Sequence, residues 1–118
     1  MKTGFGKHYM ADLYLCQNSL WETPENLEIE INNLNHPAGG VNVSWRFDIC
    51  KPENLRLIGE INDSSFILLQ IFPEASFITV DMFSWRPPLD LQPFCESLID
   101  LFAPQVVAAE TKLRAEHL

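Results

Sequence analysis

Three apolar segments follow one another in the middle of this chain, and the segments between them are very short. Residues 55–61, 65–72 and 76–85 each have the length and apolar content of a strand. The separators, residues 62–64 and 73–75, are short enough to be hairpin turns. Consecutive strands joined by hairpins run antiparallel, so this region predicts an antiparallel sheet.

The N-terminal half adds two strands and a helix. Residues 8–15 and 41–49 alternate between apolar and polar side chains, as half-buried strands do. Between them, Thr23-Pro24-Glu25 combines a capping residue, a proline in the first turn and an acid near the positive end of the helix dipole. A helix is therefore expected from there to about Leu34, followed by the helix-ending segment 35–40.

The C-terminal third predicts a second helix and a last strand. Residues 89–102 place Leu91, Phe94, Leu98 and Leu101 at helical spacing. After Pro104, residues 105–112 fit a strand and residues 106–117 fit a frayed helix, and we favour the strand.

Together these elements predict one α+β domain over residues 1–118. The expected order is β-α-β-β-β-β-α-β, which gives an antiparallel sheet with helices on one face. The run 66–72, FILLQIF, is too apolar to leave one face in water, so we expect it in the middle of the sheet and covered by helices.

Charge and hydropathy narrow the class of partner. The formal net charge is −8, which repels phosphate backbones and anionic lipids and is compatible with a cationic small molecule. No apolar run approaches the roughly 20 residues that span a bilayer, and the N-terminus lacks the apolar stretch of a signal peptide. We therefore expect a cytoplasmic protein that binds neither nucleic acid nor membrane.

The cysteines and histidines are too scattered to suggest a disulfide framework or a metal site. They are Cys16, Cys50, Cys95, His8, His36 and His117. No two of them have the spacing of a zinc motif, so we expect free thiols and no bound metal.

Two segments resemble the S-adenosylmethionine decarboxylase family of the small bacterial and archaeal type. Residues 6–16, GKHYMADLYLC, match a family opening of glycine and histidine and then a strand that ends Asp/Glu-Leu-Tyr-Gly-Cys. Leu15 stands where the family has its glycine. Phe72-Pro73-Glu74 and residues 80–85, VDMFSW, match the family's Trp-Pro-Glu and Val-Asp-Ile-Phe-Thr-Cys. The resemblance implies the same fold and, for small members, a homodimer.

The family makes its own cofactor, and the resemblance places the cleavage serine at Ser65. In the family, a serine within Glu-Ser-His attacks the preceding carbonyl, the chain splits, and the serine becomes a pyruvoyl group. This ketone forms a Schiff base with S-adenosylmethionine and draws electrons during decarboxylation, which feeds spermidine synthesis. If Ser65 is processed we expect a pyruvoyl cofactor there, and otherwise none.

Three chemical roles of the family are replaced in this chain. The histidine that assists cleavage is Phe66, which cannot move protons. The second histidine is Gln70, an amide that does not titrate, and the proton-donating cysteine is Trp85. A second serine that assists processing falls nearest Leu57.

Several binding roles have candidates that remain. Glu74 matches the glutamate that accepts hydrogen bonds from the ribose diol, and Phe66 and Phe72 are available to hold the adenine, as is Phe47. Gln70 and Trp85 complete the substrate-binding set, and the expected ligand is S-adenosylmethionine or a related nucleoside.

Each candidate also has a purely structural interpretation. Ser65 fits a hairpin serine that bonds to local backbone, Glu74 fits a solvated turn residue, and Trp85 fits packing at the edge of the core. Asp12 and Asp81 are carboxylates within strands, for which the resemblance suggests structural roles.

Three functional hypotheses remain open. The first is a decarboxylase-like protein that neither cleaves itself nor decarboxylates and that keeps nucleoside binding or acts through protein contacts. The second is a working decarboxylase in which Cys50 or Cys95 replaces the missing proton donor. The third is another enzyme acting on S-adenosylmethionine, such as one that eliminates methylthioadenosine, with Glu74 at its centre.

Overall fold

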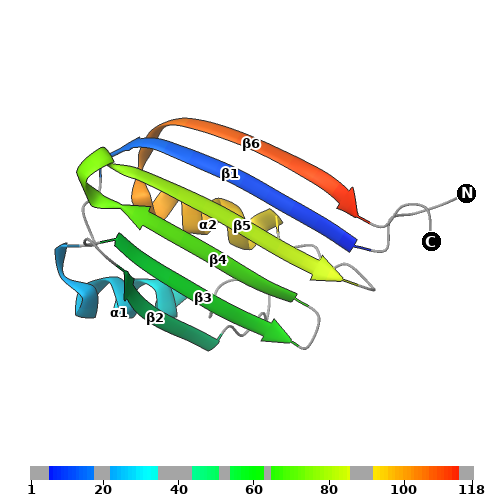
Figure 1. The fold of residues 1–118 in the computed structure, drawn as a ribbon, viewed down its shortest axis with the longest axis horizontal. Coiled ribbons are helices and arrows are strands. Elements are labelled where there is room, and N and C mark those ends of the chain that lie inside the picture. The colour runs from blue at the N-terminus through cyan, green and yellow to red at the C-terminus, as the bar shows by residue number, and fades with distance from the viewer. Residues whose placement is uncertain are drawn as a thin grey trace, which may run out of the picture.

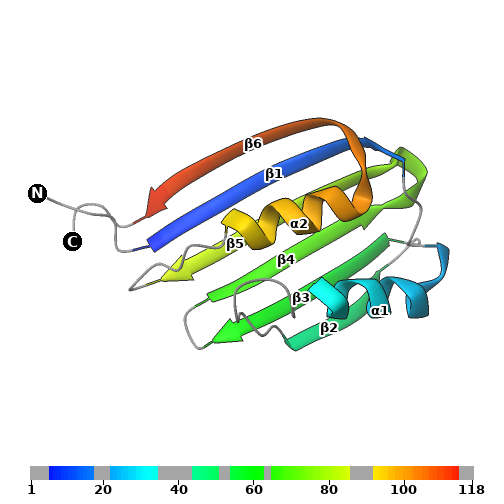
Figure 2. The same ribbon diagram turned by 180° about the vertical axis from the view of Figure 1, so that it is seen from behind.

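The structure is a computed structural model that describes residues 6–17, 22–34, 44–50, 54–62, 65–85 and 92–114. It has two layers, a six-stranded sheet and a pair of helices on one of its faces (Figures 1 and 2). In chain order the elements are β1 Gly6–Cys16, α1 Pro24–Leu34, β2 Ser44–Cys50, β3 Asn54–Asn62, β4 Ser65–Phe72, the 3-10 turn η2 Pro73–Ala75, β5 Phe77–Trp85, α2 Gln92–Phe102 and β6 Pro104–Arg114. The predicted α+β class and element order are confirmed.

All neighbouring strands run antiparallel, in the order β2-β3-β4-β5-β1-β6. Strands β2 to β5 form a continuous meander, which is the hairpin arrangement that the short separators predict. The N-terminal strand β1 then lies between β5 and the C-terminal strand β6. Residues 105–112 are therefore strand, as favoured, and this strand extends to Pro104 and Arg114.

Both helices bury one apolar face against the sheet. Leu27 and Ile31 of α1 are fully buried, as are Leu98 and Phe102 of α2. The backbone N–H of Leu27 donates to the carbonyl oxygen of Thr23 at 3.1 Å, so α1 begins at the predicted capping residue. Within the described residues, no helix is both long and apolar enough to cross a membrane.

Strand β4 lies third in the sheet, as expected, but only one of its faces is covered. Its odd-numbered side chains are buried beneath the helices, whereas the even-numbered ones are partly exposed. Phe66 keeps 37% of its surface accessible. The expectation that this apolar strand has no open face is therefore wrong for a single chain, because both helices cover the same side.

Several sequence-based expectations fall outside the described residues. These are the end of the first helix at 35–40, the start of the second strand at 41–43, the separator residues 63–64, and the start of the second helix at 89–91. The side chains of Phe47 and Cys50 also lie outside the description.

Candidate functional site

The face of the sheet opposite the helices carries the polar side chains of the central strands, and we call it the open face. Because side chains alternate along a strand, it holds the even-numbered residues of β3, β4 and β6, those of β1 up to Tyr14, and the odd-numbered residues of β5. Opposite residues in neighbouring strands form rows across this face, and each row has a distinct chemistry.

One row is a stack of three rings. His8 lies opposite Phe83 on β5, which in turn lies opposite Phe66 on β4. The ring centroids of His8 and Phe83 are 3.9 Å apart, and those of Phe83 and Phe66 are 4.7 Å apart, with interplanar angles of 19° in both pairs. With Phe66 at its end, the stack presents an aromatic surface on which a planar ligand could stack.

A second aromatic row lies toward the other end of the same strands. Phe77 on β5 contacts Tyr14 on β1 at 5.1 Å between centroids and Phe72 on β4 at 5.8 Å. The two aromatic rows therefore bracket the middle of the open face, where most of the side chains are polar.

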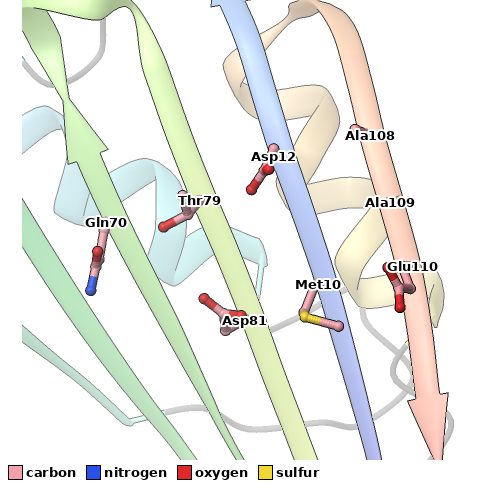
Figure 3. A pocket seen from close by; sticks show the side chains of 8 residues that line it. All are labelled: Met10, Asp12, Gln70, Thr79, Asp81, Ala108, Ala109 and Glu110. Atoms are coloured by element: carbon pink, nitrogen blue, oxygen red, sulfur yellow. The ribbon is translucent and has the colours of Figure 1, made fainter.

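The polar middle of the open face is a pocket of about 410 Å³ (Figure 3). Its lining comes from four strands and consists of Met10, Asp12, Gln70, Thr79, Asp81, Ala108, Ala109 and Glu110. The volume lies within the range of small-molecule sites. In Figure 3 the Asp12 carboxylate points from β1 toward β5, on the side where Thr79 and Asp81 lie.

The pocket is acidic and has no cationic residue in its lining. It carries the carboxylates of Asp12, Asp81 and Glu110. The Nε2 atom of His8 lies 3.0 Å from Oδ1 of Asp81, so the imidazole holds this carboxylate at the margin of the pocket. Such a field favours a positively charged ligand. In the described parts of the chain, no group of His, Cys, Asp or Glu side chains is arranged to hold a metal ion.

The structure places Ser65 on the other face of the sheet. Ser65 is 2% exposed on the helix side, and its hydroxyl oxygen lies 3.0 Å from that of Ser84, which is equally buried. Phe66, Gln70 and Phe72 point to the open face, because each follows Ser65 by an odd number of residues along the strand. The cleavage candidate and these three binding candidates thus lie on opposite faces of β4.

Glu74 and Trp85 lie at opposite ends of the sheet. Glu74 is exposed in the turn η2 that follows β4. An 8-residue strand is about 26 Å long, so Ser65 and Glu74 are too far apart to touch one small ligand in a single chain. Trp85 ends β5 and covers Gly6, where an added Cβ would lie 2.5 Å from Cε3 of the indole. Of the predicted site residues, only Gln70 lines the pocket.

Sequence reasoning missed most of the pocket. Asp12 and Asp81 were expected to have structural roles, yet both line it. The signal was available in the alternation of β1 and β5, where these acids fall on the face opposite the buried Leu13 and Val80. The contribution of β6 had no such signal, because nothing in the sequence shows that β6 pairs with β1.

The thiol of Cys95 lies on the helix side of the sheet, whereas the pocket lies on the open face. Its side chain is fully buried on α2 and hydrogen-bonds to Tyr9. Burial raises the pKa of Cys95 to about 12. The hydrogen bond with Tyr9 works against this rise, and the nearby charge of Glu96 adds to it. Its position beneath the sheet, and not its pKa, is what separates this thiol from the pocket.

The sheet, with both helices on one face and an acidic pocket on the other, defines a two-layer α+β protein with a pocket of small-molecule size. The family model for S-adenosylmethionine decarboxylase matches residues 7–115. The chain therefore belongs to the S-adenosylmethionine decarboxylase family.

A solved structure supports the same fold. The adenosylmethionine decarboxylase from Aquifex aeolicus VF5 has a TM-score of 0.75 against this chain, at 16% identity over 96% of this chain and 92% of that one. At this identity the likeness concerns the fold alone. Among curated proteins, none matches this chain.

Proposed function

We propose that this protein is a decarboxylase-like member of its family that binds S-adenosylmethionine or a related nucleoside on the open face and neither cleaves itself nor decarboxylates. The observation that carries the proposal is an acidic pocket flanked by two aromatic rows on the open face. The residues that move protons during cleavage in the family are replaced in this chain. The family connects such a protein with polyamine biosynthesis.

The pocket suits a ligand with a cationic part and a planar part. Asp12, Asp81 and Glu110 would attract the sulfonium and ammonium groups of S-adenosylmethionine. Phe66 and Phe72 each end an aromatic row next to this acidic centre, and either offers a ring for the adenine.

Among the described residues, the side-chain partner of Ser65 is a hydroxyl and not the histidine that assists cleavage in the family. The Ser65 side chain faces the helix layer and pairs with the hydroxyl of Ser84, which does not act as a base near neutral pH. The next residue, Phe66, is part of the aromatic stack and supplies no proton transfer. These contacts support the proposal of an uncleaved chain without a pyruvoyl group.

We further propose a homodimer in which a second copy covers the open face. Phe66 and Tyr14 are 37% and 40% exposed there, although both lie on inner strands of the sheet. A two-fold axis across the strands would set Glu74 of one chain against the opposite end of β4 in the other. Leu68 lies on the open face of β4, opposite Asp81. Leu68→Glu would then halve the assembly mass, whereas Ile29→Glu on the exposed side of α1 would not.

Two measurements on one sample test the ligand and the processing separately. Intact mass spectrometry is expected to show a single chain of 13.5 kDa, and calorimetric titration is expected to show binding of S-adenosylmethionine. Fragments split before Ser65, or labelling by a hydrazine, would establish processing and contradict the first claim. No heat of binding would contradict the second, and a new nucleoside product would favour the eliminating enzyme instead.

A further inference from the structure

Strand β6 forms one of the two edges of the sheet and is exposed along most of its length (Figure 1). It is 11 residues long, and among the described strands only β1 pairs with it. Residues 105–113 are exposed on both faces of the strand, which shows that the helix layer does not reach it. Three large apolar side chains are among them, namely Val106, Val107 and Leu113.

The free edge of β6 has few of the features that usually prevent strand pairing, and its charges are confined to Glu110, Lys112 and Arg114. Its only proline, Pro104, is the first residue, and residues 105–109 carry no charge. Proteins normally shorten such an edge, or interrupt it with charges, bulges or prolines, because its unpaired N–H and C=O groups are a template for another strand. A long, regular and partly apolar edge is therefore suited to accept one.

We propose that this edge pairs with β6 of a second copy, antiparallel and about a two-fold axis at Thr111, so that two sheets become one. In an antiparallel pair about such an axis, two residues lie opposite each other when one precedes the axis residue by as many positions as the other follows it. With the axis at Thr111, Glu110 of each chain lies opposite Lys112 of the other, and Ala109 lies opposite Leu113. Opposite charges directly across an antiparallel pair stabilise it.

Charge selects this register over its neighbours. An axis at Glu110 would oppose the two glutamates. An axis at Lys112 would set Glu110 opposite Arg114 but would oppose the two lysines, and a like-charge pair at the axis is destabilising in both registers. An axis at Ala109 would set Glu110 opposite Ala108 and leave both charges without a counterpart. The strand is thus complementary to itself in one register, which favours a second copy over a foreign strand.

The edge contact joins the backbones of two rim strands, so it can form whether or not the open face is occupied; of the two side chains that set its register, Glu110 also lines the pocket. If both contacts form and their two-fold axes intersect at right angles, four chains of 13.5 kDa close into an assembly of about 54 kDa. If only one forms, the assembly is a dimer, and its sensitivity to substitution shows which one it is.

The test compares assembly mass by light scattering for Glu110→Lys, Lys112→Glu and an equimolar mixture of the two. Each variant alone places like charges across the edge, so its mass should be half that of the wild type at the same concentration. In the mixture both cross-strand pairs are restored, with charge reversed in one of them, so the wild-type mass should return. Glu30→Lys, an exposed charge reversal on α1, is the control that should keep the wild-type mass.

Recovery in the mixture also shows that both variants are folded, so a loss of mass cannot be attributed to misfolding. A monomeric wild type, or equal masses for wild type and both single variants, would overturn the edge contact. If Leu68→Glu halves the mass while the β6 variants do not, the open-face dimer stands and the edge contact fails. The converse result would support the edge contact alone.

Discussion

The Nε2 atom of His8 lies 3.0 Å from Oδ1 of Asp81, joining two neighbouring strands across the open face. The same imidazole stacks on Phe83 at 3.9 Å between centroids. The carboxylate at the margin of the pocket is thus held by a ring that is itself fixed in the aromatic row. One residue therefore connects the acidic part of the candidate site with its aromatic part.

The first prediction concerns the pocket charges. Asp12→Asn and Asp81→Asn each remove one negative charge from the lining and keep the side-chain shape. We expect each to weaken S-adenosylmethionine binding on the order of tenfold, or about 1.4 kcal/mol, because a nearby counter-charge is lost. Calorimetric titration measures the effect, with Glu30→Gln on α1 as the matched control. Unchanged affinity in both pocket variants would place the ligand elsewhere.

The second prediction concerns Leu15, which adopts the left-handed conformation with φ of 54°. It interrupts the pairing of β1 with β6, since Tyr14 pairs with Val106 and Cys16 with Pro104. The side chain is 54% exposed, so its loss removes little buried surface. Leu15→Gly should therefore raise the free energy of unfolding by about 1 kcal/mol.

Urea denaturation measures this difference. Val107→Gly, on an exposed and regular part of β6, is the control and should lower stability, because glycine weakens an ordinary strand. A destabilised Leu15→Gly would mean that the leucine side chain contributes more by its contacts than it loses by strain.

The fold was largely predictable because its decisive signals are local. The short separators around residues 65–72 fix antiparallel neighbours, and Thr23-Pro24 fixes the start of α1. What could not be predicted is the place of β1 between β5 and β6, since that pairing joins the two ends of the chain. Residue alternation gives the face of each side chain, whereas the non-local strand order decides which side chains meet.

The candidate site was predictable only in part for the same reason. Family motifs named Ser65, Glu74 and Gln70 as one functional set, but motif order carries no information about the faces and ends of a strand. Alternation separates Ser65 from Gln70, and the length of β4 separates Ser65 from Glu74. The pocket itself depends on β6, whose neighbour the sequence does not reveal.

The third prediction concerns the buried hydroxyl pair of Ser65 and Ser84, whose oxygens are 3.0 Å apart. A double-mutant cycle with Ser65→Ala and Ser84→Ala should give a coupling of about 1 kcal/mol in unfolding free energy, the usual contribution of a buried hydrogen bond. Additive losses would show that the two hydroxyls are satisfied independently of one another.

The fourth prediction concerns alkaline pH. Burial raises the pKa of the Cys95 thiol from 9.0 to about 12, and that of Tyr9, its hydrogen-bond partner, from 10.0 to about 12. Both groups are neutral when protonated, so the folded state favours their protonated forms. Their contribution to stability is complete below pH 9 and is lost as pH rises toward 12.

Unfolding free energy should therefore fall between pH 9 and 12, and Cys95→Ala should make that fall shallower. The same burial predicts that Cys95 reacts slowly with thiol reagents in the native state, since only the thiolate is nucleophilic. The control is Lys7→Ala, an exposed strand residue, which should keep the wild-type pH profile. Equal alkaline slopes in wild type and Cys95→Ala would contradict the assignment, because they would show that the thiol releases its proton as readily folded as unfolded.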